Sequence, residues 1–547
     1  MPNMSDVIFP DVTLTPDEIT QRYPQRCLPE GAQVTRFAPS PTGFLHIGGL
    51  FTAMINYRLA KKTGGVFFIR IEDTDKKREV EGGIELITKG LEDFGIIADE
   101  GFTSTGQKGG YGPYQQSQRR DIYRVFAKKL MDEGKAYPCF MTEGELEEIR
   151  AEQEKNKQNP GIYGQYAKYR GITPDEAQKL IDEGRSFVVR LRSCGDESRR
   201  IKFKDSIRGK IEMPENIQDT VILKADGIPT YHFAHVIDDH LMGTTTVIRG
   251  DEWISSVPIH LQMFYMLGFK APNYAHVAPI MKEENGGKRK LSKRKDPEAA
   301  VSFYREAGYP MQSVSEYLMT IASSAYEDFR RANPRADVGE FNFELRKMSQ
   351  SGALFDLNKL NDVSKNTISR MTADTVYDLA ADWAKEYDAG LYSLLSRDEG
   401  YSKGIFAIDR DNPKPRKDIA KWSEVRDYVA FMFDELFLRP SAELLAKYDA
   451  ADAKAVLAAY AGVYDQNDSK DEWFERMKTV CDTLGFARET KAYKQSPESY
   501  KGHIGDVSTI IRAAVTGRTN TPDLYYIEQL LGYERVVGRI KEFAESL

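Results

Sequence analysis

One segment of the chain, from Arg36 to Gly49, combines residue types that could bind a phosphate group. It reads Arg36-Phe-Ala-Pro-Ser-Pro-Thr-Gly-Phe-Leu-His-Ile-Gly-Gly49, and its prolines lack the N–H that a central strand needs. Apolar residues at helical spacing follow, so we expect a strand over 34–37, a turn, and a helix that begins beside His46. The N–H groups at a helix N-terminus bind anions, and a histidine can donate a hydrogen bond to phosphate. An ordinary strand–helix turn with a surface histidine is the alternative.

A second segment, from Lys282 to Lys295, carries seven basic residues and two adjacent glycines. It contains the run Lys288-Arg-Lys-Leu-Ser-Lys-Arg-Lys295, and we expect a charged loop over 282–296. A mobile basic loop could stabilise a polyphosphate whose leaving group gains negative charge during a reaction. A solvated run of charges and a patch for a nucleic-acid backbone are alternatives that this segment alone leaves open.

Length and composition limit the class of protein. The chain has 547 residues, of which 41% are hydrophobic and 29% charged, and its net charge is −7. This length suits about three or four domains. No apolar run is long enough to span a membrane, and Met1–Leu14 contains no Lys or Arg and so is not a signal peptide. The cysteines Cys27, Cys139, Cys194 and Cys481 form no C-x-x-C pair, so we expect a cytoplasmic protein with free thiols.

The order of the expected elements predicts an α/β fold. Strand and helix alternate from residue 34, with a buried strand over 66–71 and a helix over 84–94, which is typical of a doubly wound parallel sheet. A glycine-rich loop over 102–118 and a module of mixed helices and short strands then interrupt the sheet. The sheet is expected to resume through 231–243, and the chain to be nearly all helical from residue 297.

These patterns predict a doubly wound, Rossmann-type domain with an inserted α+β module, followed by all-α domains. The expected parts are an N-terminal extension (1–33), the first half of the Rossmann-type domain (34–117), the inserted module (118–215), the second half (216–315), a first helical domain (316–375) and a last helical domain (376–547).

Taken together, the two basic and glycine-containing segments resemble the two signatures of class I aminoacyl-tRNA synthetases. Pro39–Gly49 resembles the first signature, and Lys290-Leu-Ser-Lys-Arg294 resembles the second, 244 residues after His46. The finer resemblance is to the glutamyl-tRNA synthetase family of bacterial type. The motifs that carry it, in that family's order, are Arg36–Gly43, Arg70-Ile-Glu-Asp-Thr-Asp75, Gly112-Pro-Tyr-Gln-Gln-Ser117, Asp238-Asp-His-Leu-Met-Gly243 and Val247-Ile-Arg-Gly250. The resemblance is dense from residue 34 to 360 and thinner beyond.

The resemblance implies an ATP-dependent ligase. Such an enzyme activates L-glutamate with ATP and Mg²⁺, releases pyrophosphate, and transfers glutamate to the 3′ end of tRNA(Glu). The resemblance makes His46, Gly48, Lys290 and Lys293 the catalytic residues, with Lys293 on the leaving pyrophosphate. The residues that it implies for ATP binding are Pro39, Ser40, Pro41, Thr42, Gly43, Phe44, Leu45, His46, Ile47, Gly48, Gly49, Glu252, Lys290, Leu291, Ser292, Lys293 and Arg294.

The resemblance also implies a pocket for the amino acid. It places Arg36 and Arg249 on the side-chain carboxylate of glutamate, because a guanidinium group binds a carboxylate in a fork. Ser40 and Tyr231 would be hydrogen-bond partners, and Glu72 would accept from the substrate ammonium group.

Neighbouring acidic and imidazole residues are given structural roles. Asp73 and Asp75 are expected to cap the following helix rather than hold a metal ion. His232, His235 and His240 are spaced so that they could bind a metal, but we expect them to pack at a strand end. Many relatives have a cysteine cluster in the inserted module, where this chain has Cys139 only, so neither zinc nor another metal site is expected.

The resemblance assigns the inserted module to the acceptor end of tRNA, 316–375 to the stem and 376–547 to the anticodon, in a monomer. A non-discriminating form, which also charges tRNA(Gln), stays open as an alternative. Ser40-Pro-Thr-Gly43 disfavours a glutaminyl enzyme, and the long helical tail disfavours a short tRNA-modifying paralogue and a small-molecule adenylyltransferase. The intact His46, Gly48, Lys290 and Lys293 argue against a tRNA-binding protein without catalysis.

Overall fold

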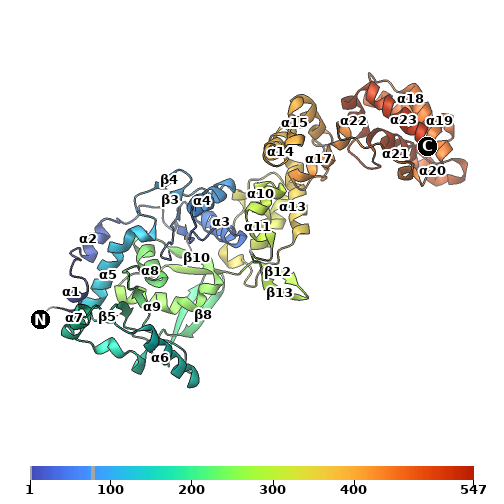
Figure 1. The fold of residues 1–547 in the computed structure, drawn as a ribbon. Helices are drawn as coiled ribbons and strands as arrows, with labels where there is room; N and C mark the ends of the chain where they lie inside the picture. The colour runs from blue at the N-terminus through green and yellow to red at the C-terminus, as the bar shows by residue number, and fades with distance from the viewer. Residues whose placement is uncertain (1–2, 76–79, 293) are drawn as a thin grey trace. The chain divides into compact units, whose positions relative to one another are not determined.

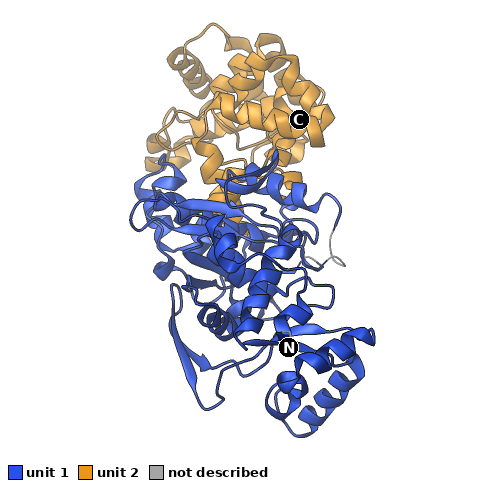
Figure 2. Cartoon of the chain, turned by 90° about the vertical axis from the view of Figure 1, so that its left-hand side faces the viewer, with its two compact units in different colours: residues 1–303, 318–356 blue, residues 304–317, 357–547 orange. Residues whose placement is uncertain are grey.

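The computed structural model describes residues 3–75, 80–292 and 294–547 (Figure 1). The chain divides into two compact units, which Figure 2 colours separately. The first unit comprises residues 1–303 and 318–356 and holds every strand described, whereas the second comprises residues 304–317 and 357–547 and is helical. None of the helices in the described ranges has both the length and the apolarity that a membrane crossing needs.

The bounds of the elements are as follows. The strands are β1 (Val34–Phe37), β2 (Val66–Ile69), β3 (Glu100–Thr103), β4 (Gly106–Lys108), β5 (Ala136–Cys139), β6 (Val188–Leu191), β7 (Arg200–Asp205), β8 (Gly209–Pro214), β9 (Val221–Leu223), β10 (Thr246–Gly250), β11 (Asn273–Val277), β12 (Met281–Glu284) and β13 (Gly287–Lys290). The helices before residue 300 are α1 (Met4–Ile8), α2 (Pro16–Gln21), α3 (Ile47–Lys62), α4 (Gly83–Asp93), α5 (Arg120–Asp132), α6 (Glu143–Lys155), α7 (Pro174–Asp182), α8 (Tyr231–Leu241) and α9 (Val257–Leu267). The later helices are α10 (Ser302–Ala307), α11 (Met311–Ala322), α12 (Ala325–Ala332), α13 (Leu357–Arg370), α14 (Ala373–Tyr387), α15 (Ala389–Arg397), α16 (Glu399–Ala407), α17 (Val425–Tyr428), α18 (Ala450–Val463), α19 (Lys470–Leu484), α20 (Thr490–Gln495), α21 (Ile504–Thr516), α22 (Leu524–Leu531) and α23 (Tyr533–Ser546).

Two parallel strand pairs form the base of the first unit. β1 runs parallel to β2, and β10 runs parallel to β11. The two pairs begin side by side, because the backbone N–H of Thr245 donates to the carbonyl of Val34 at 3.0 Å and the N–H of Val34 donates to Thr245 Oγ1 at 2.8 Å. The carboxyl ends of β1 and β10 therefore face the same side, where ligands bind in open α/β sheets.

Smaller antiparallel sheets complete the first unit. β5, β6 and β9 form one sheet, and the hairpin β7–β8 joins the second parallel pair where Asp205 lies opposite Tyr274 of β11. Both associations cross residue 215, at which the sequence analysis ends the inserted module. The six-part division of the chain accordingly stays a prediction.

The N-terminal extension packs on the first unit. α1 and α2 bring Ile8, Phe9, Ile19 and Tyr23 into the apolar cluster that contains Phe126 of α5. The extension is therefore part of the core of this unit.

Two expectations about local structure are wrong. Residues 231–241 form helix α8 rather than part of the resumed sheet. Eight of the eleven residues of α8 are buried, Asp238 and Asp239 among them, so its polar residues do not mark an exposed face. The expected loop over 282–296 is largely the hairpin β12–β13, whose two-residue turn is Asn285-Gly286, with φ of 53° and 77°. Asn-Gly at positive φ is the preferred sequence for such a tight turn.

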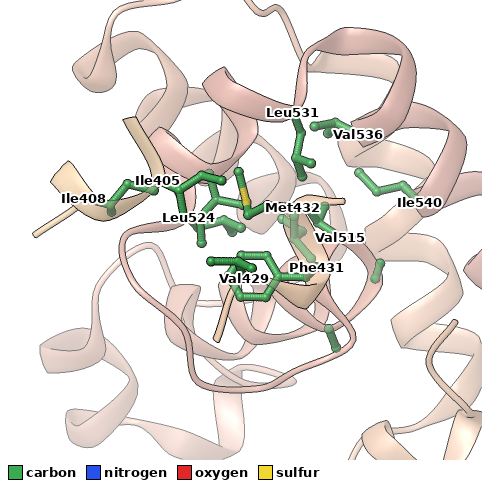
Figure 3. Close-up of a cluster of buried hydrophobic side chains, with 14 of the residues drawn as sticks. Ile405, Ile408, Val429, Phe431, Met432, Val515, Leu524, Leu531, Val536 and Ile540 are labelled. Atoms are coloured by element: carbon green, nitrogen blue, oxygen red, sulfur yellow. The ribbon is translucent and has the colours of Figure 1, made fainter. Parts of the chain in front are cut away.

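The second unit has its own apolar core. The core brings residues of α22 and α23 together with residues of the segments before α18, as the close-up in Figure 3 shows for Ile405, Phe431, Met432, Leu524 and Ile540. These side chains are almost completely buried. The prediction of a nearly all-helical chain after residue 297 is confirmed.

Candidate active site

A cavity of about 650 Å³ opens at the carboxyl ends of β1, β2 and β10. The start of α3, the start of α8 and the end of β13 supply further parts of its wall. The predicted site residues that line it are Arg36, Ser40, His46, Gly48, Gly49, Glu72, Tyr231, Arg249, Glu252 and Lys290. Residues from both signature-like segments thus meet in one cavity.

His46 caps the N-terminus of α3, as the sequence predicts. Its Nδ1 accepts a hydrogen bond from the backbone N–H of Gly48 at 2.9 Å. A Cβ atom at residue 48 would lie only 3.1 Å from this nitrogen, so glycine keeps the cap undisturbed. Gly43 has a φ of 118°, which side chains rarely adopt, and this allows the turn before the helix.

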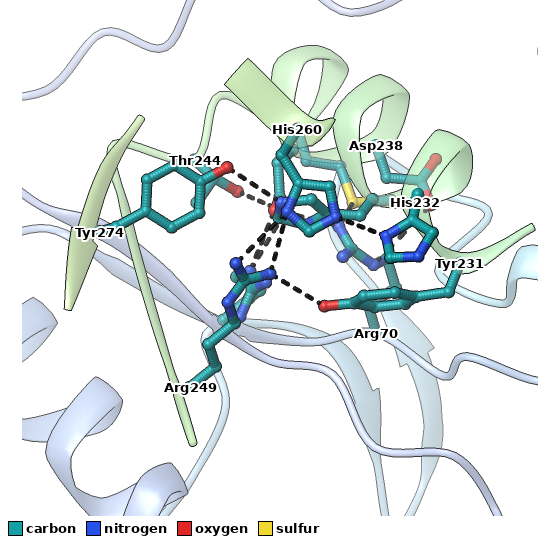
Figure 4. Close-up of polar contacts among 12 residues, drawn as sticks. Arg70, Tyr231, His232, Asp238, Thr244, Arg249, His260 and Tyr274 are labelled. Atoms are coloured by element: carbon teal, nitrogen blue, oxygen red, sulfur yellow. Dashed lines mark hydrogen bonds and ion pairs between the residues drawn. The ribbon is translucent and has the colours of Figure 1, made fainter. Parts of the chain in front are cut away.

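A buried ion-pair network connects the two halves of the parallel sheet (Figure 4). Asp239 of α8 accepts from Arg36 Nε at 3.2 Å and from Arg70 Nη1 at 2.7 Å, and Arg70 Nη2 donates to Glu72 Oε1 at 2.9 Å. Burial alone would raise the pKa of Asp239, but Arg36 and Arg70 outweigh burial and hold this pKa well below its usual value. One carboxylate from the second half therefore fixes two arginines from the first half.

Glu72 and Asp73 follow β2 but have different surroundings. Burial raises the pKa of Glu72, and the nearby Arg70 and Arg36 only partly oppose this effect. Asp73 accepts from the backbone N–H of Ser117 at 2.8 Å and from Gln115 Nε2 at 2.7 Å, so it holds the 115–117 loop. The expected role of Asp73 as a helix cap is wrong, because the next helix described, α4, begins after Gly82. Asp75 lines the cavity and does not cap α4 either.

Arg249, at the end of β10, is 5% exposed and faces the cavity. Its Nη1 donates to the hydroxyl of Tyr231 at 3.2 Å, and its Nη2 donates to the carbonyl of Trp253 at 3.2 Å. The rings of Tyr231 and Trp253 lie 4.4 Å apart between centroids, and the guanidinium group lies over the ring of Tyr274, 5.0 Å from its centroid. Imidazole nitrogens provide its other hydrogen bonds.

Only part of the basic segment is available to a ligand. Arg289 donates to Asp296 and Glu284, and Lys282 pairs with Asp296, so these two cations hold the hairpin β12–β13 together. Lys290 lines the cavity, with its Nζ 3.8 Å from Glu252 Oε2. Lys293 lies outside the described residues.

The predicted histidines are packed, but on a helix. His240 of α8 stacks on Phe269 with ring centroids 3.6 Å apart, and His232 contacts His260. Burial lowers the pKa of His235 to about 3 and that of His232 to about 4. In the described ranges no group of three or more His, Cys, Asp or Glu residues could hold a metal ion.

Comparison with known families agrees with this geometry. The family described as "tRNA synthetases class I (E and Q), catalytic domain" matches residues 33–362, and the family described as "Anticodon binding domain" matches residues 414–544. A glutamate–tRNA ligase of Clostridium perfringens (strain SM101 / Type A) is 54% identical over 545 residues, which cover 99% of both chains. This chain belongs to the glutamate–tRNA ligase family.

More distant members of the glutamate–tRNA ligase family also match along their whole length. The one from Acetivibrio thermocellus is 47% identical and covers 98% of both chains. The crystal structure of a glutamate tRNA ligase from Elizabethkingia meningosepticum, in complex with its amino acid, has a TM-score of 0.75 at 27% identity. It covers 94% of this chain and 99% of that one. The predicted family and fold class are confirmed.

Within this glutamate–tRNA ligase fold, some residues predicted to bind ATP do not line the cavity. Leu45, Ile47 and Leu291 are buried in the core instead. Pro39, Pro41, Thr42, Gly43, Phe44, Ser292 and Arg294 are likewise absent from the described lining of the cavity. The ATP-binding roles of all these residues stay predictions.

Several residues that act behind the cavity wall of this ligase were not predicted from the sequence. Arg70 and Asp239 hold Arg36 and Glu72, and His260 and His276 contact Arg249. The sequence offered two signals of this buried network, because buried charges require partners. One is the charged Arg70 in the buried β2 region, and the other is the pair of aspartates in α8. No comparable pattern marked the two histidines.

Proposed function

We propose that this chain forms glutamyl-adenylate in the cavity and transfers the glutamyl group to the 3′ end of tRNA(Glu). The observation that carries the proposal is that one cavity combines two binding surfaces. One part presents the guanidinium groups of Arg36 and Arg249, and another is the N-terminus of α3 with its capping His46. The first surface suits a carboxylate, and the second suits a polyphosphate.

Glutamate would bind with its side-chain carboxylate on Arg249 and Arg36. Both guanidinium groups are oriented before the substrate arrives, by Tyr231 for Arg249 and by Asp239 for Arg36. Ser40 would add a hydrogen bond, and the Tyr231 hydroxyl would contact the same carboxylate. The ammonium group would donate to the carboxylate of Glu72. The hydrogen bond from Arg70 to Glu72 Oε1 keeps this carboxylate in place.

ATP would lie over His46, Gly48 and Gly49. Because Nδ1 of His46 accepts a hydrogen bond, the neutral imidazole carries its proton on Nε2 and can donate it to a phosphate oxygen. The remaining segment Pro39–Gly49 would shape this surface, and Glu252 would contact the nucleotide. Mg²⁺ would enter with the phosphates of ATP and keep most of its water ligands.

The chemistry then needs little from the protein beyond position and charge. The substrate α-carboxylate attacks the α-phosphorus in line, forms the mixed anhydride, and breaks the bond to pyrophosphate. Lys290 and Lys293 would stabilise the negative charge that develops on the pyrophosphate. A hydroxyl of the terminal adenosine of tRNA next attacks the glutamyl carbonyl carbon, and AMP leaves.

The helical second unit would provide selectivity for tRNA(Glu), since its residues 414–544 match an anticodon-binding family. Recognition of one tRNA by one continuous chain does not need a second copy, so we propose a monomer. We propose the cytoplasm as its location, where the tRNA substrate and ATP are present.

The direct test is ATP–pyrophosphate exchange with glutamate and with glutamine, each with and without tRNA, followed by charging of purified tRNA(Glu) and tRNA(Gln). The proposal predicts exchange that depends on glutamate and charging of tRNA(Glu). Absence of glutamate-dependent exchange under all conditions would refute it. Charging of both tRNAs would establish the non-discriminating form.

Two substitutions at His46 separate its structural role from its proposed catalytic role. In His46→Asn, the amide oxygen can still accept from Gly48 and cap α3, but it places no donor where Nε2 stands. We expect wild-type thermal stability and a kcat for activation that is roughly 10²-fold lower. His46→Ala should also lose about 1 kcal/mol of helix-cap stability. Activity of His46→Asn close to that of the wild type would remove the imidazole from catalysis.

A further inference from the structure

Arg249 is surrounded by neutral hydrogen-bond acceptors, and two of them are histidines. Figure 4 shows Arg249 with Tyr231 and His260. Its Nε donates to His276 Nε2 at 3.1 Å, and its Nη1 and Nη2 lie 3.3 Å from His260 Nδ1. The Tyr231 hydroxyl and the Trp253 carbonyl accept the remaining hydrogen bonds, and the guanidinium group lies over the ring of Tyr274. Among the described residues no carboxylate lies within ion-pair distance of Arg249.

The contacts determine which nitrogen of each imidazole carries the proton. Arginine only donates, so His276 Nε2 and His260 Nδ1 must accept. His276 therefore carries its proton on Nδ1, which donates to Asp205 Oδ2 at 2.7 Å. His260 carries its proton on Nε2, which donates to His232 Nδ1 at 2.9 Å. Each imidazole must be neutral to keep Arg249 in place.

Electrostatics agree with this assignment. His260 and His276 are fully buried, and burial is the main cause that lowers the pKa of each below its usual value. The positive charge of Arg249 opposes protonation of both rings as well. Both imidazoles thus remain acceptors at neutral pH.

The two arginines of the pocket differ in how their charge is balanced. Asp239 contacts Arg36 directly at 3.2 Å, so a protein carboxylate already compensates that cation. The nearest carboxylate behind Arg249 along the hydrogen-bond chain is Asp205, and the ring of His276 separates the two. Arg249 is therefore a buried cation that is held firmly but has no direct counter-ion in the described part of the chain, and such a charge costs free energy of folding unless an anion binds.

We propose that His260 and His276 are positioning residues that hold the Arg249 guanidinium through neutral hydrogen-bond acceptors. Because these acceptors do not neutralise Arg249, its positive charge can pair with the carboxylate of the substrate side chain. This inference rests on the proposed function, which places the glutamate carboxylate on Arg249. A carboxylate at either histidine position would neutralise Arg249 and remove the advantage of an anionic substrate over a neutral one. The histidines thus determine selectivity for glutamate over glutamine.

Four substitutions of one residue test the inference in the full chain. His276→Gln can place an amide oxygen near the Nε2 position and accept from Arg249, whereas His276→Asn keeps only a donor toward Asp205. His276→Leu removes both contacts, and His276→Glu places a carboxylate against Arg249. The measurements are kcat and KM for glutamate and for glutamine, by pyrophosphate exchange in the presence of tRNA, with thermal unfolding as the fold control.

We expect His276→Gln to retain a glutamate KM within about threefold of the wild type, because a neutral acceptor remains. His276→Asn and His276→Leu should raise that KM about tenfold or more, with a smaller change in kcat. His276→Glu should lower kcat/KM for glutamate by at least about 100-fold and lower that for glutamine much less, so that the preference for glutamate collapses.

Equal losses for both amino acids in His276→Glu would overturn the inference, as would a His276→Gln variant no better than His276→Leu. If His276→Glu does not fold, His260→Asp and its neutral match His260→Asn give the same comparison. Arg249→Gln separates this inference from the proposed function. An unchanged glutamate KM in Arg249→Gln would refute the proposed pocket itself, whereas a raised KM with unaffected histidine variants would refute only the role of the histidines.

Discussion

Replacing Glu528 by glutamine should remove a pH dependence from the stability of the second unit. Glu528 lies on α22 and is fully buried. Its Oε2 accepts from the Tyr460 hydroxyl at 2.7 Å and from Trp473 Nε1 at 2.8 Å, and its Oε1 is buried without a partner among the described residues. Burial raises the pKa of Glu528 from 4.5 to about 7, and the two hydrogen bonds only partly oppose it.

The raised pKa of Glu528 determines both the direction and the size of the change in stability with pH. Between pH 4.5 and 7 the folded state holds a proton on Glu528 that the unfolded chain releases. The contribution of Glu528 to the free energy of unfolding should therefore be largest below pH 4.5 and fall as the pH rises through this window. A difference of this size between the two pKa values corresponds to about 3 kcal/mol, and most of it is lost by neutral pH.

Hydrogen exchange detected by mass spectrometry can follow peptides of α22 in the full chain between pH 5 and 8, after correction for intrinsic rates. The wild type should lose protection as the pH rises, and Glu528→Gln should not, since its amide can still accept from Tyr460 and Trp473 but carries no charge. Glu534→Gln is the matched control, because Glu534 is exposed, and it should keep the wild-type slope. If protection in Glu528→Gln fell with pH as steeply as in the wild type, Glu528 would not be the cause of the pH dependence.

Two further predictions concern the first unit and the basic segment. Asp239→Asn leaves two buried arginines without their shared carboxylate and should lower the free energy of unfolding of the first unit by about 3–5 kcal/mol. Calorimetry on the full chain measures this change. The control is Asp121→Asn, at an exposed residue, which should stay within about 0.5 kcal/mol of the wild type. A first-unit transition unchanged by Asp239→Asn would contradict the importance of the network. Lys293→Ala should lower kcat for glutamate activation roughly 10²-fold and leave the KM for glutamate nearly unchanged, as expected for a contact made to the leaving pyrophosphate. Pyrophosphate exchange at the wild-type rate would exclude Lys293 from the mechanism.

Local sequence rules were sufficient for the strand, turn and helix from Val34 to Lys62. Prolines exclude a central strand, Gly43 permits the turn, and helical spacing starts the helix after His46. The same kind of rule could have identified the hairpin β12–β13 from Asn285-Gly286, but the density of positive charge around this pair suggested a loop instead.

The rest of the site could not be read from local patterns. Arg36 and Asp239 are 203 positions apart, and only the folded sheet brings them together. Their pairing leaves no periodic trace in the sequence, because the two residues lie in different elements, β1 and α8, and no local pattern links their positions. The same holds for His260 and His276, whose imidazoles meet Arg249 from α9 and β11. Helix α8 was missed although Phe233, Val236, Ile237 and Leu241 recur at helical spacing, because its polar residues are largely buried as well and mark no exposed face.

A crystal structure of the full chain with a non-hydrolysable analogue of glutamyl-adenylate tests the central claim most directly. We expect the glutamyl carboxylate within hydrogen-bond distance of Arg249 and Arg36, the ammonium group against Glu72, and the phosphate mimic at the N-terminus of α3 beside His46. An analogue bound with its glutamyl group away from both arginines, or with its adenosine outside the cavity, would contradict it.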